Sequence, residues 1–382
     1  MTSPDLLPAD LHPAPGALHD EVAAALVAET ATVLSVPTIA KENSFILHAP
    51  LELMARVGLL PLVAPGRRTD ALGRIESLRD QYRAMGDPVA VPPAVADADA
   101  PGLVAALAAG DLDRVDALAA ALLPGLDAAG AAAAVAGAIV PSLAAAGHAP
   151  IGLALLARVP GLPATLLRPT LHSLAGHPDW RLTWFEAERE VATATHADLY
   201  GALRAAPRLG RPGSDFIYPL MSQIEGDGAP ARLLDPVLSA SRDARAAAAV
   251  LARTAAWSML HDDPSQAPYG WSHALTMPQG VMALAGSAVP ARTAVAVAGT
   301  YVLGFRAAHG TVDLPDVLAA GEWPATTVEE LATAAALHED AHLVKYTLAC
   351  IHAAADDPAF APLYLSAADH LVRWWRAADA AG

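Results

Sequence analysis

The chain has 382 residues, of which 54% are hydrophobic and 17% are charged, and this balance excludes general disorder. Its formal net charge of -16 argues against nucleic acid or an anionic membrane as the main partner. The single cysteine, Cys350, excludes a disulfide scaffold and any cysteine-based zinc or iron–sulfur site.

The start of the sequence and its apolar stretches give no sign of export or of membrane insertion. The first 16 residues are acidic and Pro-rich, without the basic and apolar regions of a signal peptide. The apolar stretch from Ala131 to Ala146 contains Pro141 and is too short to span a bilayer. We therefore expect a protein of the bacterial cytoplasm that binds neither membrane nor nucleic acid.

The sequence predicts an all-α fold of many short helices packed as a single large helical domain. Ala and Leu are strong helix formers and dominate the chain, with 92 alanines, while the alternation typical of strands is scarce. Frequent Pro and Gly residues, 32 and 27, limit the helix lengths. The predicted helices are, in chain order, Leu18–Leu34, Pro50–Leu60, Arg68–Met85, Pro101–Ala108, Leu112–Leu122, Ala128–Ala146, Ile151–Ala157, Arg181–Leu203, Ala229–Met259, Met277–Leu284, Ala291–His309, Thr327–Ala355 and Pro362–Ala380.

Two breaks suggest how the chain is divided. The Pro-rich segment Asp87–Pro101 is expected to be a connecting loop, and residues 208–214 (RLGRPGS) mark a sub-domain break. Residues 1–29 are predicted to form an N-terminal extension and first helix, and residues 30–382 the helical domain.

The segment Thr327–Ala355 has the clearest helical pattern. Thr326 or Thr327 can cap it, with Glu329 or Glu330 three residues later as a capping box, and no Pro or Gly interrupts it. The segment carries His338, His342, Lys345 and His352, whose spacings of four, three and seven residues place them on one helix face.

Four of the 14 histidines lie within apolar sequence, namely His48, His148, His273 and His342. A buried neutral imidazole must satisfy two ring nitrogens, and convergence of the four on one metal ion would do so. Any one of them alone is more often a hydrogen-bonded core residue, and spacing along the chain does not show that they converge.

Lysine is rare in this sequence. Of 24 basic residues, 22 are Arg, and only Lys41 and Lys345 are Lys. Unlike Arg, a lysine can become a neutral amine and react with carbon dioxide to form a carbamate, a carboxylate on a long arm. Alternatively, Lys345 reaches solvent or pairs with Glu339 or Asp340. Lys41 is interpreted as an ordinary surface charge.

Four patches of the sequence resemble the questin oxidase-like family of fungal and bacterial secondary metabolism, in the family's order between Thr30 and Trp375. The patches are ENSFILHAPLELMARVGLLP (42–61), AGHAPIGLALLA (146–157), YGWSHALTMPQGVMAL (269–284) and HEDAHLVKYTLAC (338–350).

This resemblance implies a non-heme iron oxygenase that uses molecular oxygen to open a ring of a polycyclic aromatic or quinone-type polyketide, by C–C cleavage or a Baeyer–Villiger-like reaction. It also implies an Fe(II) site. The ligands carried over from the family are His48, His148, His273, His342 and a carbamate on Lys345 formed from CO2.

The residues themselves are compatible with that chemistry. Imidazole and carboxylate ligands suit Fe(II). No GxGxxG turn follows a strand, so we expect no flavin or NAD(P) site. Glu339 and Asp340 are predicted to orient a ligand imidazole, and His352 is the reserve ligand should His148 not bind.

Two other interpretations stay open. His261 and Asp262 supply the dipeptide of HD-type metal-dependent phosphohydrolases, although the helix there ends before Pro264. A non-catalytic helical scaffold would explain the helices and the acidity, but not histidines in the most apolar segments.

For the enzyme, the expected partner is a small aromatic molecule, and a homodimer is one option for its assembly. Tyr269 and Trp271 either line an aromatic pocket or belong to the core.

Overall fold

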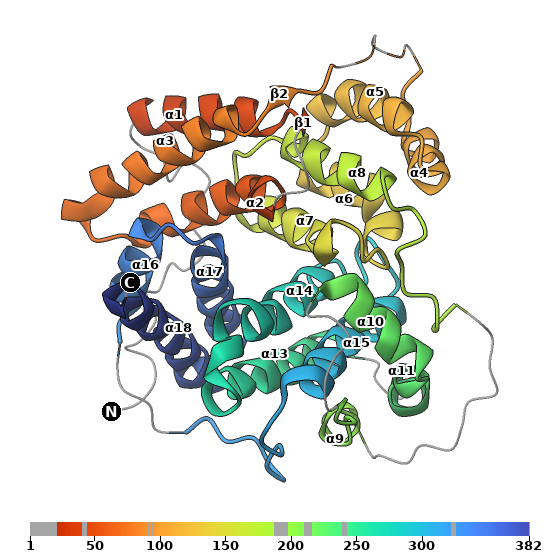
Figure 1. Cartoon of the computed structure of the whole chain (residues 1–382), viewed down its shortest axis with the longest axis vertical. Coiled ribbons are helices and arrows are strands. Elements are labelled where there is room, and N and C mark those ends of the chain that lie inside the picture. Colours follow the sequence, from red (N-terminus) through yellow and green to blue (C-terminus); the bar gives the residue numbers. More distant parts are fainter. Residues whose placement is uncertain are drawn as a thin grey trace.

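The chain folds as an all-α structure, as its composition predicts (Figure 1). The computed structural model describes residues 21–39, 44–90, 92, 95, 97–186, 198–209, 216–238, 243–321 and 326–381. Within these residues the only sheet is a short antiparallel pair, β1 (Thr38–Ile39) with β2 (Asp87–Pro88).

The helices vary from one turn to more than five turns. In the first half they are α1 (Glu21–Leu34), α2 (Ser44–Leu59), α3 (Arg68–Ala84), α4 (Ala100–Ala109), α5 (Leu112–Leu122), α6 (Ala128–Ile139), α7 (Ala149–Arg158) and α8 (Arg168–Ala175). In the second half they are α9 (Leu199–Arg204), α10 (Ile217–Gly226), α11 (Ala229–Leu233), α12 (Asp235–Leu238), α13 (Ala244–His261), α14 (Ser272–Met282), α15 (Ala291–His309), α16 (Val328–Leu337), α17 (Ala341–Asp356) and α18 (Ala361–Ala381).

Short turns of tighter or wider helix connect several of these elements. The 3₁₀ turns are η2 (Leu60–Leu62), η3 (Pro65–Arg67), η4 (Leu123–Gly125), η5 (Ala145–Gly147), η6 (Ala164–Leu167), η7 (Pro264–Gln266) and η9 (Pro358–Phe360). One turn of π-helix, η8 (Ala267–Trp271), leads directly into α14.

Four helices form a closed ring of contacts at the centre of the molecule. Helix α2 packs on α7 and α17, and α14 packs on the same two helices from the other side (Figure 1). Gly280 of α14 lies against the backbone of α7, where a Cβ atom would come within 2.8 Å of the Ile151 nitrogen. The absence of a side chain there lets α14 approach α7 closely.

Two helices of this ring begin earlier than the sequence predicts, because each runs through a proline. Helix α2 begins at Ser44 and continues through Pro50, and α14 begins at Ser272 and continues through Pro278. Each proline removes one backbone donor, a cost that the tight packing of both helices offsets. The predicted starts at Pro50 and Met277 were therefore wrong.

The predicted single helix Thr327–Ala355 is two helices. The capping box of Thr327 and Glu330 is confirmed, but α16 ends at Leu337 and the backbone at His338 is extended. Asp340 then begins α17, since its side chain accepts the backbone N–H groups of His342 and Leu343. An aspartate favours an N-cap over a helix interior, and here it interrupts an otherwise continuous pattern. His338 consequently does not share a helix with His342.

Three further predicted helices, Ala128–Ala146, Arg181–Leu203 and Ala229–Met259, also differ from the structure. Ala128–Ala146 ends as helix α6 at Ile139, ahead of Pro141, and the chain bends before α7. Residues 181–186 form a turn instead of a helix start, with the Thr183 and Trp184 amides donating to Glu225. The rest of that predicted helix up to α9 lies mostly outside the described residues. Ala229–Met259 divides into α11, α12 and α13.

The predicted boundary between an N-terminal extension and the helical domain can be compared with helix α1. The boundary at residue 29 falls inside this helix, which packs on α2 and α3 and contributes Val27, Ala31 and Leu34 to the common core. Residues 210–215 of the proposed break near 208–214 lie outside the described residues.

One helical stretch in the described part of the chain, Ser44–Leu62, is long and apolar enough to cross a membrane. However, 72% of it is buried inside the structure, where α2 forms one side of the central ring. Packing in the protein core accounts for its apolar character.

A buried ion pair fastens α2 to the end of α16. Glu52 and Arg56 lie one turn apart on α2, with 2.8 Å between Arg56 Nε and Glu52 Oε1. The Arg56 guanidinium also donates to the backbone carbonyls of Ala336 and His338. Burial raises the pKa of the Glu52 carboxyl, while Arg56 opposes that effect. The pair thus holds α2 against the segment in which α17 begins.

We expect Arg56→Met to destabilise the protein by about 3–5 kcal/mol, because it leaves the buried Glu52 carboxylate without a partner. The double variant Arg56→Met, Glu52→Met should recover a large part of that loss, since it buries no lone charge. Urea denaturation of the three proteins measures both effects. A loss below 1 kcal/mol for the single variant would contradict the assigned role.

Candidate metal centre

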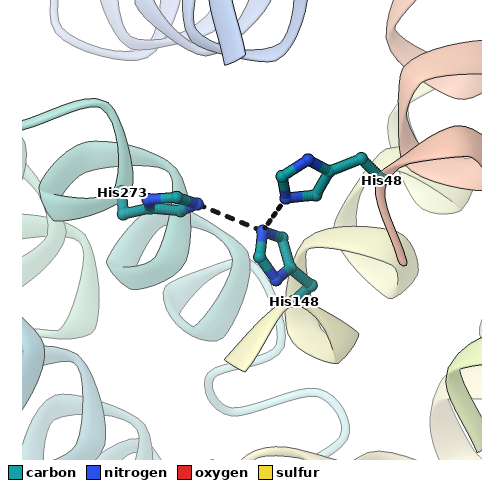
Figure 2. A group of neighbouring side chains, drawn as sticks. All are labelled: His48, His148 and His273. Atoms are coloured by element: carbon teal, nitrogen blue, oxygen red, sulfur yellow. Dashed lines mark hydrogen bonds between the residues drawn. The ribbon is translucent and has the colours of Figure 1, made fainter. Parts of the chain in front are cut away.

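Three of the four predicted histidines converge at one end of the central helix ring. His48 of α2, His148 immediately before α7 and His273 of α14 each offer one ring nitrogen, and these atoms lie within 4.8 Å of one another (Figure 2). The His48 Nε2 and His148 Nε2 atoms are 2.9 Å apart, and His148 Nε2 and His273 Nε2 are 3.1 Å apart. We call these three residues the histidine cluster.

His148 is held by an unusual backbone turn. The three residues before it, Ala145, Ala146 and Gly147, have φ values of 49°, 50° and 67°, and two of them are not glycine. A left-handed alanine is costly, and such strain concentrates at functional sites. The turn directs the Ala145 carbonyl to His148 Nδ1 at 2.9 Å. Because a carbonyl only accepts, His148 Nδ1 carries the hydrogen.

His273 is fixed by a carbonyl in the same manner. Its Nδ1 donates to the carbonyl oxygen of Tyr269, which lies four residues earlier, within the π-helical turn η8. Single π-turns inside or beside helices often occur at functional sites. In the neutral tautomer, both His148 and His273 then carry their only N–H on Nδ1.

The consequence is an electrostatic conflict between the two Nε2 atoms. Each Nε2 atom carries a lone pair and no hydrogen, and the two atoms lie 3.1 Å apart. Protonation of either ring would relieve the conflict, but burial lowers the pKa of both His148 and His273 well below its usual value. A metal cation between the nitrogens would satisfy both lone pairs at once.

The spacing of the nitrogens fits that solution. Two ligands at right angles, each with a metal–imidazole bond of about 2.1 Å, are about 3.0 Å apart. The two separations of 2.9 and 3.1 Å match this value. In a tetrahedral site the same bonds would place the nitrogens about 3.4 Å apart. Both separations are close to those of two nitrogens bound to one metal ion.

The fourth predicted ligand, His342, adjoins the cluster. It does not belong to the group of three, but its ring centroid lies 4.4 Å from that of His48 and 4.9 Å from that of His273. Its Nδ1 lies 3.3 Å from the Asp340 carboxylate. This contact directs the Nδ1–H group of His342 to Asp340. The lone pair of His342 Nε2 is then available to bind a metal.

All of these residues lie where their helices begin. His148 precedes α7, and His48, His273, His342 and Lys345 each fall within the first five residues of α2, α14 or α17. The positive end of a helix dipole disfavours an imidazolium and favours an anion. Together with burial, this setting keeps the imidazoles neutral, which is the form that binds a metal.

Lys345 lies one turn after His342 on α17 and is only 3% exposed. Its Nζ atom has no hydrogen-bond partner within the part of the chain that the structure describes. Burial lowers the pKa of Lys345 to about 7, although Asp340 and Glu52 act in the opposite direction. The pairing with Glu339 or Asp340 and the escape to solvent considered from the sequence are both absent here.

The two predicted acidic residues behave differently. Asp340 contacts His342 and caps α17, as a residue that orients a ligand would. Glu339 is not brought into the cluster, since its side chain is 81% exposed and pairs with Arg74 at 3.0 Å. His352, the reserve ligand, is buried two turns beyond Lys345 and is not one of the converging histidines. Lys41 lies outside the described residues.

His261 and Asp262, the residues of the HD-type alternative, make other contacts in the structure. Asp262 is buried, pairs with the Arg306 guanidinium and accepts the amides of Thr311 and Val312. His261 stacks on Trp257 and bonds to its carbonyl. Asp262 thus ties the end of α13 to the end of α15, which is a structural role.

Some of the site could not be anticipated from the sequence. The carbonyls of Ala145 and Tyr269 carry no residue-type signal, and their role depends on backbone geometry. Glu52 and Arg56 were also missed, although two charges inside an apolar helix were a visible signal. Tyr269 is resolved as a surface residue, 52% exposed, whereas Trp271 is fully buried in the core.

Comparisons with protein-family models, with curated proteins and with solved structures found no match to this chain. The resemblance to the questin oxidase-like family, and the activity that it implies, therefore stay predictions.

We expect Lys345→Met to stabilise the metal-free protein, in buffer without carbon dioxide, by roughly 1–4 kcal/mol at pH 7, because it removes an unpaired buried amine. The advantage should shrink toward pH 10. Between the folded pKa of about 7 and the higher unfolded value, the unfolded chain holds a proton that the folded chain has lost. Wild-type stability therefore rises with pH in that window, by up to roughly 1.4 kcal/mol per unit.

Denaturant unfolding of both proteins at pH 7 and pH 10 checks this expectation. A Lys345→Met variant that is less stable than the wild type at both pH values would show that the amine has a structural role.

Proposed function

We propose that this protein is a non-heme iron oxygenase that uses molecular oxygen to open a ring of a polycyclic aromatic or quinone-type polyketide. The observation that carries the proposal is the pair of Nε2 lone pairs of His148 and His273, which face each other at 3.1 Å in a buried site. With His48 and His342, these residues would hold the metal. The identity of the metal as Fe(II) rests on the family resemblance and on the affinity of imidazole and carboxylate ligands for iron.

Lys345 supplies the second part of the proposal. A neutral amine adds to carbon dioxide: an N–C bond forms, one C=O bond becomes the carboxylate, and a proton leaves to water. The pKa of about 7 keeps a large share of the Lys345 amine in the reactive form at neutral pH. The resulting carbamate would give the site a negative ligand, close to the helix starts that favour an anion.

Bound among these residues, Fe(II) would activate molecular oxygen beside an electron-rich ring, and the ring would supply the electrons, so that no flavin or nicotinamide is needed. The protein's own groups hold the ligands and shape the approach. The Ala145 and Tyr269 carbonyls fix two imidazoles, and Asp340 fixes a third. Such outer contacts set the orientation and the basicity of metal ligands.

An aromatic substrate would approach from the side of Tyr269. Tyr269 is 52% exposed as a residue, and its ring meets the His342 ring edge-on, with 4.8 Å between centroids. A flat polycyclic ring can stack or pack against such an exposed aromatic surface while it remains beside the cluster. The burial of His48, His148 and His273 keeps bulk water away from the reacting centre.

We expect one iron per chain after anaerobic loading with Fe(II) and desalting. His148→Ala should lower iron affinity at least about 10- to 100-fold, because it removes the nitrogen that both other histidines face. The matched control is His261→Gln, which removes a histidine outside the cluster and should keep the wild-type iron content. Metal analysis measures all three proteins. Equal iron in His148→Ala and wild type would exclude the site.

We expect Lys345→Arg to be less stable than the wild type, because it buries a permanent charge. We also expect it to consume oxygen with a hydroxylated anthraquinone about 10- to 100-fold more slowly at a temperature where it stays folded, since Arg forms no carbamate. Lys345→Glu restores a carboxylate on a shorter arm and should retain more iron than Lys345→Met. An oxygen electrode and metal analysis provide the two readings. Wild-type turnover by Lys345→Arg would disprove the role of the lysine.

A further inference from the structure

Two adjoining cavities lead toward Lys345, and the site as proposed makes no use of them. The larger one measures about 400 Å³ and is bordered by α13, α14, the end of α17 and Tyr364 of α18. The smaller one measures about 20 Å³ and has Lys345 in its wall. Arg158 and Gln279 line both cavities, so the two spaces adjoin at these side chains.

The larger cavity reaches the protein surface. Its wall includes Asp356, whose side chain is 45% exposed, and Arg158, which is 27% exposed and pairs with Asp356 at 2.6 Å. Gln279 is held at the junction, where its Nε2 donates to the Ala349 carbonyl at 2.9 Å. A molecule that enters near Asp356 therefore meets Arg158 and Gln279 before it meets Lys345.

The smaller cavity limits what can pass. A space of about 20 Å³ accepts roughly one water-sized molecule, since about 10–15 Å³ is the least that a water needs. No aromatic ring fits in it. Its wall combines apolar residues with the polar or basic residues Arg158, Thr276, Gln279, Lys345 and His352. A space this small has no room for the hydration shell of an ion such as bicarbonate, and this favours a neutral molecule.

We infer that the two cavities form an entry route through which a small, neutral, linear molecule, carbon dioxide, reaches Lys345 Nζ without passing the Tyr269 side of the histidine cluster. The use of the route for making the carbamate rests on the proposed function, whereas the route itself rests on the geometry alone. Delivery of CO2 and approach of the aromatic substrate would then take place from different sides of the site.

Isocyanic acid, formed from cyanate, tests the route in the metal-free protein. It is neutral and linear like CO2, and it reacts with a neutral amine by forming an N–C bond while the amine proton moves to the isocyanate nitrogen. The product is a stable urea. Because the chain has only two lysines, peptide mass spectrometry can follow Lys345, with the Lys41 peptide as internal reference.

Two variants narrow the small cavity from different helices, Ala349→Leu on α17 and Ala154→Leu on α7. A third, Tyr269→Ala, opens the opposite side. We expect the carbamoylation of Lys345 to slow at least tenfold in each leucine variant and to stay within twofold of wild type in Tyr269→Ala, while Lys41 reacts equally in all.

Wild-type labelling of Lys345 in both leucine variants would overturn the inference, and so would faster labelling in Tyr269→Ala alone. No iron and no turnover enter this measurement. A route that is confirmed in a protein that binds no iron would thus refute the proposed function and leave the inference standing.

Discussion

The arrangement of the site depends on two hydrogen bonds from imidazole Nδ1 to a backbone carbonyl. Ala145 and Tyr269 accept these bonds from His148 and His273, and thereby fix which nitrogen carries the hydrogen. Since both rings are neutral in their buried setting, two lone pairs must face each other at 3.1 Å. The left-handed turn before His148 and the π-turn before His273 both hold the accepting carbonyl in place. The backbone thus keeps the nitrogens together despite their repulsion.

Charge balance connects the cluster with Lys345. The starts of helices α2, α7 and α17 around the cluster present positive dipole ends, which oppose a lone cation and favour an anion. The unprotonated form of the Lys345 amine adds no further positive charge, and its carbamate would neutralise part of the metal's charge. The buried Glu52–Arg56 pair contributes no free charge, because each partner offsets the other. The cost of burying an unpaired amine is a typical trade of stability for function.

The sequence was sufficient for the all-α fold, because helix propensity and spacing act locally. It also pointed to His48, His148 and His273, since an imidazole in apolar sequence needs a partner wherever the chain folds. It failed where tertiary packing overrides local preference, as in the helices that run through Pro50 and Pro278. The break at Asp340 was missed because one N-cap separates α16 from α17 within a continuous helical pattern. Glu339 was misplaced with it, since the break turns its side chain outward to Arg74.

The central claim is that the histidine cluster exists to hold one metal ion. Crystals of the Fe(II)-loaded protein, measured on both sides of the iron absorption edge, test it most directly. We predict a single anomalous peak within bonding distance of the Nε2 atoms of His48, His148 and His273, with added density on Lys345 Nζ. A map without a peak between these nitrogens, or with iron bound elsewhere in the chain, would contradict the account.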